Sequence, residues 1–120
     1  MGNRAASCKW VWGHDPDAGT SNAANNLVNS TGAGAVFNCH RWGENVTFYI
    51  ETNDSGYAYQ IRTARNSSGP WSVLSSNSGT TTGVTDVVQL PGPFRFVSPR
   101  VDTLASTANY VIIEMSAVES

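Results

Sequence analysis

The last third of the chain holds three short runs of β-branched and aromatic residues separated by breakers, and this pattern constrains the fold most. Side chains in residues 84–90 alternate in direction until Pro91-Gly92-Pro93, whose prolines cannot donate a sheet hydrogen bond. The second run, residues 94–103, is bent or placed at a sheet edge by Ser98-Pro99. Residues 110–115 (YVIIEM) are largely apolar on both faces, so we expect this strand in the middle of a sheet.

Five further segments have the same short β-type pattern, namely residues 7–13, 35–42, 46–52, 57–64 and 71–74. In one of them, Val46, Phe48 and Ile50 share a face and are expected to point into the core. About eight strands joined by polar turns predict an all-β, two-sheet antiparallel sandwich or a barrel. A jelly roll is the first choice because it uses eight strands; an immunoglobulin-like sandwich is the alternative that a strand count cannot separate.

The 120 residues are enough for a single domain, residues 1–120, with a core of its own. Within this domain we expect a flexible arm at residues 1–6. Residues 14–34 are polar apart from Leu27 and Val28 and are predicted to form a long surface loop with a short turn of helix around residues 23–26; the alternative is a segment that is mobile in the isolated subunit. Loops of this length are usually functional or disordered, and a contact with a neighbouring subunit would suit both descriptions.

The low charge of the chain limits its partners. Charged residues make up 13% of the sequence, about half of the ~25% that is usual for soluble domains. The net charge is −2, so no basic footprint for nucleic acid is present. No apolar run approaches the ~18 residues that span a bilayer, and no membrane partner is expected. A surface with little charge favours contacts with other protein subunits or with carbohydrate.

The first residues lack the pattern of a signal peptide, because Arg4 is not followed by an apolar core. We therefore expect a protein made in a cytoplasm. In that compartment Cys8 and Cys39 are expected to be two buried thiols, with a disulfide between them as the alternative.

Residue types that carry chemistry do not assemble into a recognisable motif. His14, Asp15, Asp17, Cys39 and His40 could offer ligands to a metal, but the paired spacings of zinc sites and the full pattern of a calcium loop are missing. There is no G-x-S-x-G nucleophile elbow, and the acidic residues fall mostly in turns or on wet strand faces rather than across a cleft. The sequence thus predicts no enzymatic activity, no cofactor and no metal.

Aromatic residues could form a flat platform for sugar rings, and six are available for it: Trp10, Trp12, Trp42, Tyr57, Tyr59 and Trp71. Core and sheet-face positions are the alternative, and β proteins usually keep their rings there. Tyr57 and Tyr59, beside the turn at residues 53–56, are the best candidates for an exposed pair. The candidate interaction residues are therefore Arg4, Trp10, Trp12, Tyr57 and Tyr59.

Residues 46–118 resemble a recurrent pattern in small structural proteins of tailed bacteriophages. The resemblance rests on FYIETNDSGYAYQIRTARNSSGPWSVL, on GVTDVVQLPGPFRFVSPRVDTLAS and on the final strand YVIIEMSAV. It implies an all-β virion component without catalysis that decorates or cements the capsid, or belongs to a head fibre or tail. Such proteins often assemble as trimers, so the implied partners are the major capsid protein and further copies of the chain.

Two hypotheses about function follow. The first is a capsid-decorating protein whose weak contacts are multiplied over many copies, with residues 1–34 making many of the contacts between subunits. The second is a carbohydrate- or receptor-binding β-sandwich of a phage tail or fibre. Exposure of the tryptophans would favour the second hypothesis.

Overall fold

The computed structural model describes residues 5–14, 26–28, 31–39, 46–78, 84–90, 95–106 and 108–118. Regular structure in these ranges consists of strands, and no helix occurs among them. The strands are β1 (Ala5–Gly13), β2 (Asn26–Val28), β3 (Gly32–Ala33), β4 (Phe37–Asn38), β5 (Val46–Thr52), β6 (Ala58–Ala64), β7 (Ser72–Ser78), β8 (Val84–Leu90), β9 (Phe96–Val97), β10 (Arg100–Thr103) and β11 (Tyr110–Val118). The described part of the chain is therefore all-β, as the sequence predicts.

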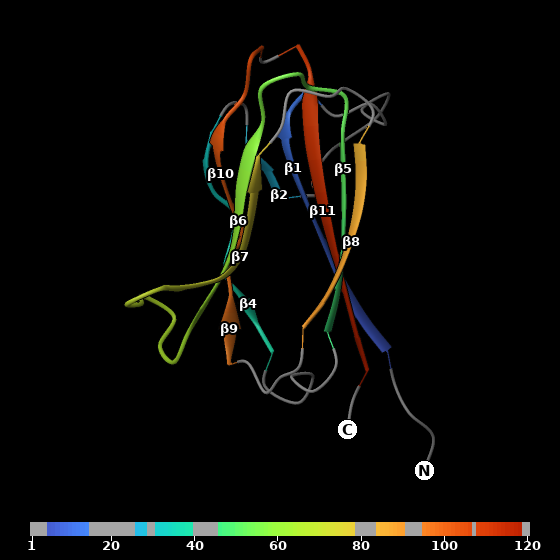
Figure 1. Cartoon of the computed structure of the whole chain (residues 1–120). Coiled ribbons are helices and arrows are strands. Elements are labelled where there is room, and N and C mark those ends of the chain that lie inside the picture. The colour runs from blue at the N-terminus through green and yellow to red at the C-terminus, as the bar shows by residue number, and fades with distance from the viewer. Residues whose placement is uncertain are drawn as a thin grey trace.

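The strands form two sheets (Figure 1). Sheet A has the order β2-β1-β11-β5-β8, and sheet B has the order β3-β10-β6-β9-β4, with β7 paired to β6. Paired strands run antiparallel, apart from the parallel pair of β1 and β2. β11 lies between β1 and β5, which confirms that the most apolar strand is internal.

Two long strands of sheet B are interrupted. β9 and β10 both pair with the same edge of β6 and are separated by Ser98 and Pro99. On their other side, β10 pairs with β3 and β9 pairs with β4. The backbone N–H of Ser98 still donates to the carbonyl of Arg62 at 3.0 Å, whereas Pro99 has no N–H to donate. The proline thus lies at an interruption between β9 and β10, inside the sheet rather than at its edge.

Once β3 with β4 and β9 with β10 are each counted as one strand, the described residues give eight long strands in addition to β2. Their pairs are nested along the chain. The first strand (β1) pairs with the eighth (β11), the second (β3 and β4) with the seventh (β9 and β10), the third (β5) with the sixth (β8), and the fourth (β6) with the fifth (β7).

Several predicted boundaries are wrong. β1 begins at Ala5, inside the predicted arm, and β2 and β3 lie inside the predicted loop of residues 14–34. Asn26 is a strand residue, which contradicts a helical turn there; residues 23–25 lie outside the described residues. β7 extends to Ser78, because its backbone pairs with β6 although its residues 75–78 are polar. Short or polar strands of this kind lack the alternation by which a strand is recognised.

The inward-facing side chains of both sheets form one buried cluster, which the alternation of each strand produces. The predicted inward positions Val46, Phe48 and Ile50 belong to it. Its other members are Trp10, Trp12, Cys39, Tyr57, Tyr59, Ile61, Val97, Val101, Val111, Ile113 and Met115.

Trp10 and Trp12 tie the two sheets together. Both side chains are fully buried on β1 of sheet A. The indole N–H of Trp10 donates to the carbonyl of Ala35, and that of Trp12 to the carbonyl of Gly32, each at 2.8 Å. These carbonyls belong to the segment that carries β3 in sheet B, so each tryptophan fills the core and satisfies a backbone acceptor across it.

Gly34 is the point where the backbone passes closest to these indoles. A Cβ at this position would lie 2.5 Å from Cδ1 of Trp10, whose ring is buried and held by its hydrogen bond. We expect Gly34→Ser to lower the free energy of unfolding by about 2 kcal/mol, because the ring has nowhere to move. Ala35→Ser, at the next and exposed position, should change it little. Urea unfolding followed by tryptophan fluorescence measures both; an equal effect would contradict the close approach.

Candidate functional site

The four aromatic residues predicted to interact with partners are not at the surface. Arg4 lies outside the described residues, while Trp10 and Trp12 are fully buried. The prediction of an exposed tyrosine pair is wrong, because Tyr57 is 4% exposed and Tyr59 is 2% exposed. Both rings fall on the inner side of β6 and the residue before it, where they stack with centroids 6.3 Å apart. These rings therefore offer no platform for a sugar.

The two remaining tryptophans do not restore such a platform among the described residues. Trp42 lies outside them. Trp71 is half-buried, and the guanidinium of Arg62 lies over its ring, 5.0 Å from the centroid. This cation–π contact covers one face of the ring.

Cys8 and Cys39 are thiols and do not form a disulfide, as expected, although Cys39 is buried and Cys8 only half-buried. Burial, followed by the neighbouring Cys8, raises the pKa of the Cys39 thiol to about 11. The thiolate is the reactive form, so Cys39 is chemically silent near neutral pH.

We expect a Cys8→Ser variant to react with an aromatic disulfide reagent at pH 8 about a hundredfold more slowly when folded than when unfolded, because so little Cys39 thiolate is present. A Cys39→Ser variant should react faster than the Cys8→Ser variant in the folded state, since Cys8 is only half-buried. Absorbance of the released thiolate measures both rates. Rapid labelling of folded Cys39 would contradict its placement in the core.

The residues considered for a metal are mostly outside the described part. Asp15, Asp17 and His40 lie outside it, and His14 is exposed. Among the described residues, no three His, Cys, Asp or Glu side chains are grouped closely enough to hold a metal ion. Nor do these residues include a helix long and apolar enough to cross a membrane.

Asp54, which the sequence places in a simple turn, is a fully buried crosslink between two loops. Its carboxylate accepts hydrogen bonds from the backbone N–H groups of Gly56 (2.9 Å), Ala105 (2.9 and 3.1 Å) and Ser106 (3.2 Å). The side-chain amide of Asn109 donates a further bond of 3.0 Å. Burial disfavours the charge, but the hydrogen bonds outweigh it and lower the pKa of Asp54 below its ordinary value. The aspartate thus fixes the loop after β5 to the loop before β11.

The outer face of sheet A carries two exposed apolar side chains next to each other. Strand register places Lys9, Glu114, Tyr49 and Val87 in one row across β1, β11, β5 and β8. Tyr49 is 47% exposed and Val87 is 61% exposed, because each lies on the face opposite to its core-facing neighbours, Phe48 and Ile50 for Tyr49 and Val88 for Val87. We call these four residues the outer row. Its charged half contains one residue of each sign, so the row is close to neutral.

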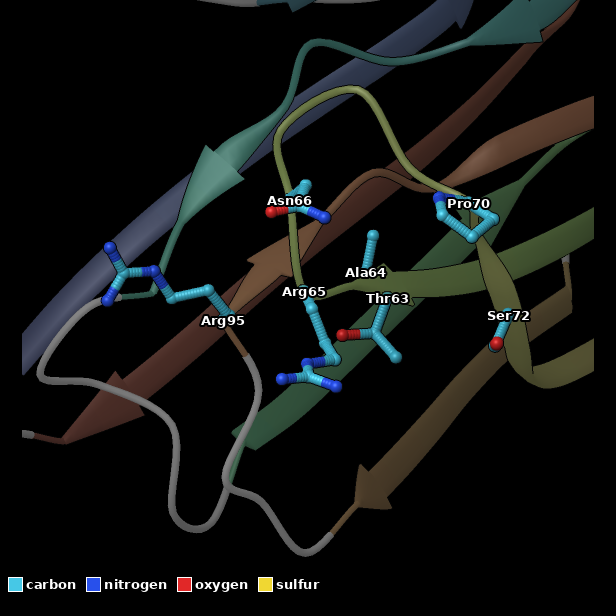
Figure 2. Close-up of a pocket in the computed structure, with 7 residues that line it drawn as sticks. All are labelled: Thr63, Ala64, Arg65, Asn66, Pro70, Ser72 and Arg95. Carbon is cyan, nitrogen blue, oxygen red and sulfur yellow. The ribbon is translucent and has the colours of Figure 1, made fainter.

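A pocket of about 640 Å³ opens at the end of sheet B where β6 finishes. We call it the arginine pocket, since Arg65 and Arg95 line it together with Thr63, Ala64, Asn66, Pro70 and Ser72. Figure 2 shows Arg95 at one end and Pro70 and Ser72 at the other, with Thr63 beside Arg65. No local sequence pattern predicts this pocket, because its lining residues come from three segments that meet only in the fold.

Comparison with solved structures finds a similar fold in the SPBc2 prophage-derived protein YomS. The two chains are 12% identical with a TM-score of 0.63, and the match covers 99% of this chain and 96% of that one. At this identity the likeness shows a shared fold alone. The K3 cleaved adhesin domain of Lys-gingipain from Porphyromonas gingivalis matches at 14% identity over 88% of this chain and 82% of that one, but its TM-score of 0.47 carries no argument. No protein-family model and no curated protein matches the chain.

Proposed function

We propose that this chain is a non-enzymatic structural protein of a bacteriophage particle, which decorates or cements the capsid through many repeated contacts. The major capsid protein and further copies of the chain are its partners, and the virion is its location. The similarity to a prophage-derived protein over almost the whole chain supports a phage origin. The resemblance of residues 46–118 to small phage structural proteins supports the same origin independently of that comparison.

The strand pairing supports a jelly roll as the fold. Nested pairs of first with eighth, second with seventh, third with sixth and fourth with fifth arise when a long antiparallel ribbon is wrapped into two sheets. An immunoglobulin-like sandwich pairs its strands in a different order. Jelly rolls are common in viral capsid proteins and also in lectins, so the fold fits both hypotheses and does not choose between them.

Burial of the aromatic residues favours decoration over sugar stacking. Trp10 and Trp12 are used inside the core, and one face of Trp71 is taken by Arg62. A carbohydrate-binding module that stacks sugars needs exposed rings. The tryptophans and tyrosines that the sequence offers for this role are buried or partly covered wherever the structure describes them.

The observation that carries the proposal is the outer row of sheet A. Tyr49 and Val87 are neighbours on adjacent strands, and both expose much of their surface. Adjacent exposed apolar residues on a sheet are typical of contact surfaces between proteins. Because the flanking Lys9 and Glu114 are of opposite sign and the whole chain is weakly charged, repulsion between identical copies is small. We propose that this row packs against other copies in a homotrimer on the shell.

The mass of the free protein in solution tests this self-association. Sedimentation equilibrium is expected to give three times the 12.8 kDa of one chain, or a monomer that becomes a trimer as the concentration rises. A monomer at all concentrations, together with binding to a panel of neutral and acidic glycans by the outer row of sheet A, would favour the receptor-binding alternative.

A further inference from the structure

The arginine pocket has the size of a ligand site. Its volume of about 640 Å³ falls within the roughly 300–1,000 Å³ that is usual for small-molecule sites. A single inorganic oxyanion would leave most of this space empty. The ligand that suits the pocket is therefore a larger molecule with several polar groups.

The pocket is positively charged. Arg65 and Arg95 line it, and the part of its lining that the structure describes contains no acidic residue. Among the described residues, the ion pair of Arg100 with Asp102 at 2.7 Å involves neither of them. The guanidinium of Arg95 contacts the ring of Phe96 at 5.3 Å from its centroid, which leaves its N–H groups available. A guanidinium with free N–H groups binds a carboxylate through two parallel hydrogen bonds.

The remaining lining is neutral and polar with a small apolar part. The hydroxyls of Thr63 and Ser72 and the amide of Asn66 can exchange hydrogen bonds with several ligand hydroxyls. The hydroxyl of Thr63 donates to the carbonyl of Phe96 at 2.9 Å, so its oxygen is held in place as an acceptor. Pro70 and Ala64 supply C–H surface against which the less polar face of a sugar ring can lie.

From these features we propose that the arginine pocket binds an acidic saccharide, a sugar of the uronic acid type whose carboxylate is held by Arg65 and Arg95. Its hydroxyls bond to Thr63, Asn66 and Ser72, and its ring lies over Pro70. Both arginines are exposed, and in Figure 2 the side chain of Arg95 extends away from Pro70. Binding in this way requires a rotation about the bonds of this long side chain that turns its guanidinium toward the carboxylate. The site lies on sheet B and is independent of the outer row.

Binding of oligogalacturonate to the full chain tests the proposal, with its methyl ester as the neutral counterpart of the same shape. Titration followed by amide NMR should shift resonances of residues 63–72, and the acid should bind at least about tenfold more tightly than the ester. Arg65→Ala and Arg95→Ala should each weaken binding of the acid by about tenfold and leave the fold intact, because both side chains are exposed. Arg100→Ala, at an arginine outside the pocket, should leave binding unchanged.

Three results would overturn the assignment. Equal binding of the acid and the ester would rule out a contact between the arginines and the carboxylate. Unchanged amide resonances at residues 63–72 would rule out this pocket as the binding site. If inorganic phosphate or a glutamate-rich peptide binds at least as tightly as the oligogalacturonate, the ligand of the pocket is another anion and not a saccharide. Loss of oligogalacturonate binding leaves the proposed trimer untouched, since its contact residues are on sheet A.

Discussion

Replacement of Asp54 by alanine is expected to lower the free energy of unfolding by about 3 kcal/mol. The change removes one buried acceptor and takes from the N–H groups of Gly56, Ala105 and Ser106 the partner that they share in a partly buried site. Hydrogen bonds to a charged group are stronger than neutral ones, and buried donors that lose them are costly. Urea unfolding measures the loss.

Asp102→Ala is the matched control. This carboxylate also has a partner, Arg100, at 2.7 Å, but both side chains are substantially exposed. An exposed ion pair contributes less than about 1 kcal/mol, so the control should change stability little. Equal losses in the two variants would contradict the role of Asp54 as a crosslink.

The pH dependence of stability gives a second readout of the same residue. The pKa of Asp54 is lower in the folded chain than its ordinary value of 3.8. Its contribution is therefore fully present above that value and is lost as the pH falls through the folded pKa. An Asp54→Asn variant lacks this titration, so the stability difference from the parent chain should shrink as the pH is lowered below about 4. A difference that grows on acidification would contradict the lowered pKa.

Replacement of Val87 by glutamate is expected to reduce trimer formation and capsid occupancy at least about tenfold while the chain stays folded. The side chain is 61% exposed in the single chain, so a carboxylate is tolerated there. Burial of that carboxylate against another copy without a positive partner is unfavourable. Sedimentation equilibrium and the amount of protein bound to purified shells measure the effect.

Val73→Glu is the control for this variant. Val73 lies on β7 of sheet B and is 51% exposed, so it tests the same chemical change on the other sheet. Trimer formation and occupancy should match those of the parent chain. Loss of occupancy in both variants would indicate a general effect of the added charge. Unchanged occupancy in both variants would show that the outer row is not the contact surface.

The sequence predicts strands well where alternation and turn residues coincide. Residues 46–52 and 84–90 match β5 and β8 to the residue, because each alternates and is bounded by clear breakers. The end of β7 and the short β2 are missed, since pairing with a neighbour holds these segments and the neighbour is not visible in the local pattern.

Functional features depend on distant contacts and were harder to predict. The turn at residues 53–56 is recognisable, but the bonds from Asp54 to Ala105 and Asn109 cross more than 50 residues. The sequence predicts Tyr57 and Tyr59 to be exposed because they adjoin that turn. In the fold, both rings instead face the core that sheet B shares with sheet A. The class of partner that low charge suggests stays a prediction, and only the fold brings Tyr49 beside Val87.

The copy number of the chain in purified particles of the phage that encodes it tests the central claim most directly. Quantitative mass spectrometry against the major capsid protein should give a fixed ratio, with the chain present in many copies that follow the symmetry of the shell. Absence from the particles, or a small number of copies that stays with isolated tails, would contradict decoration of the capsid.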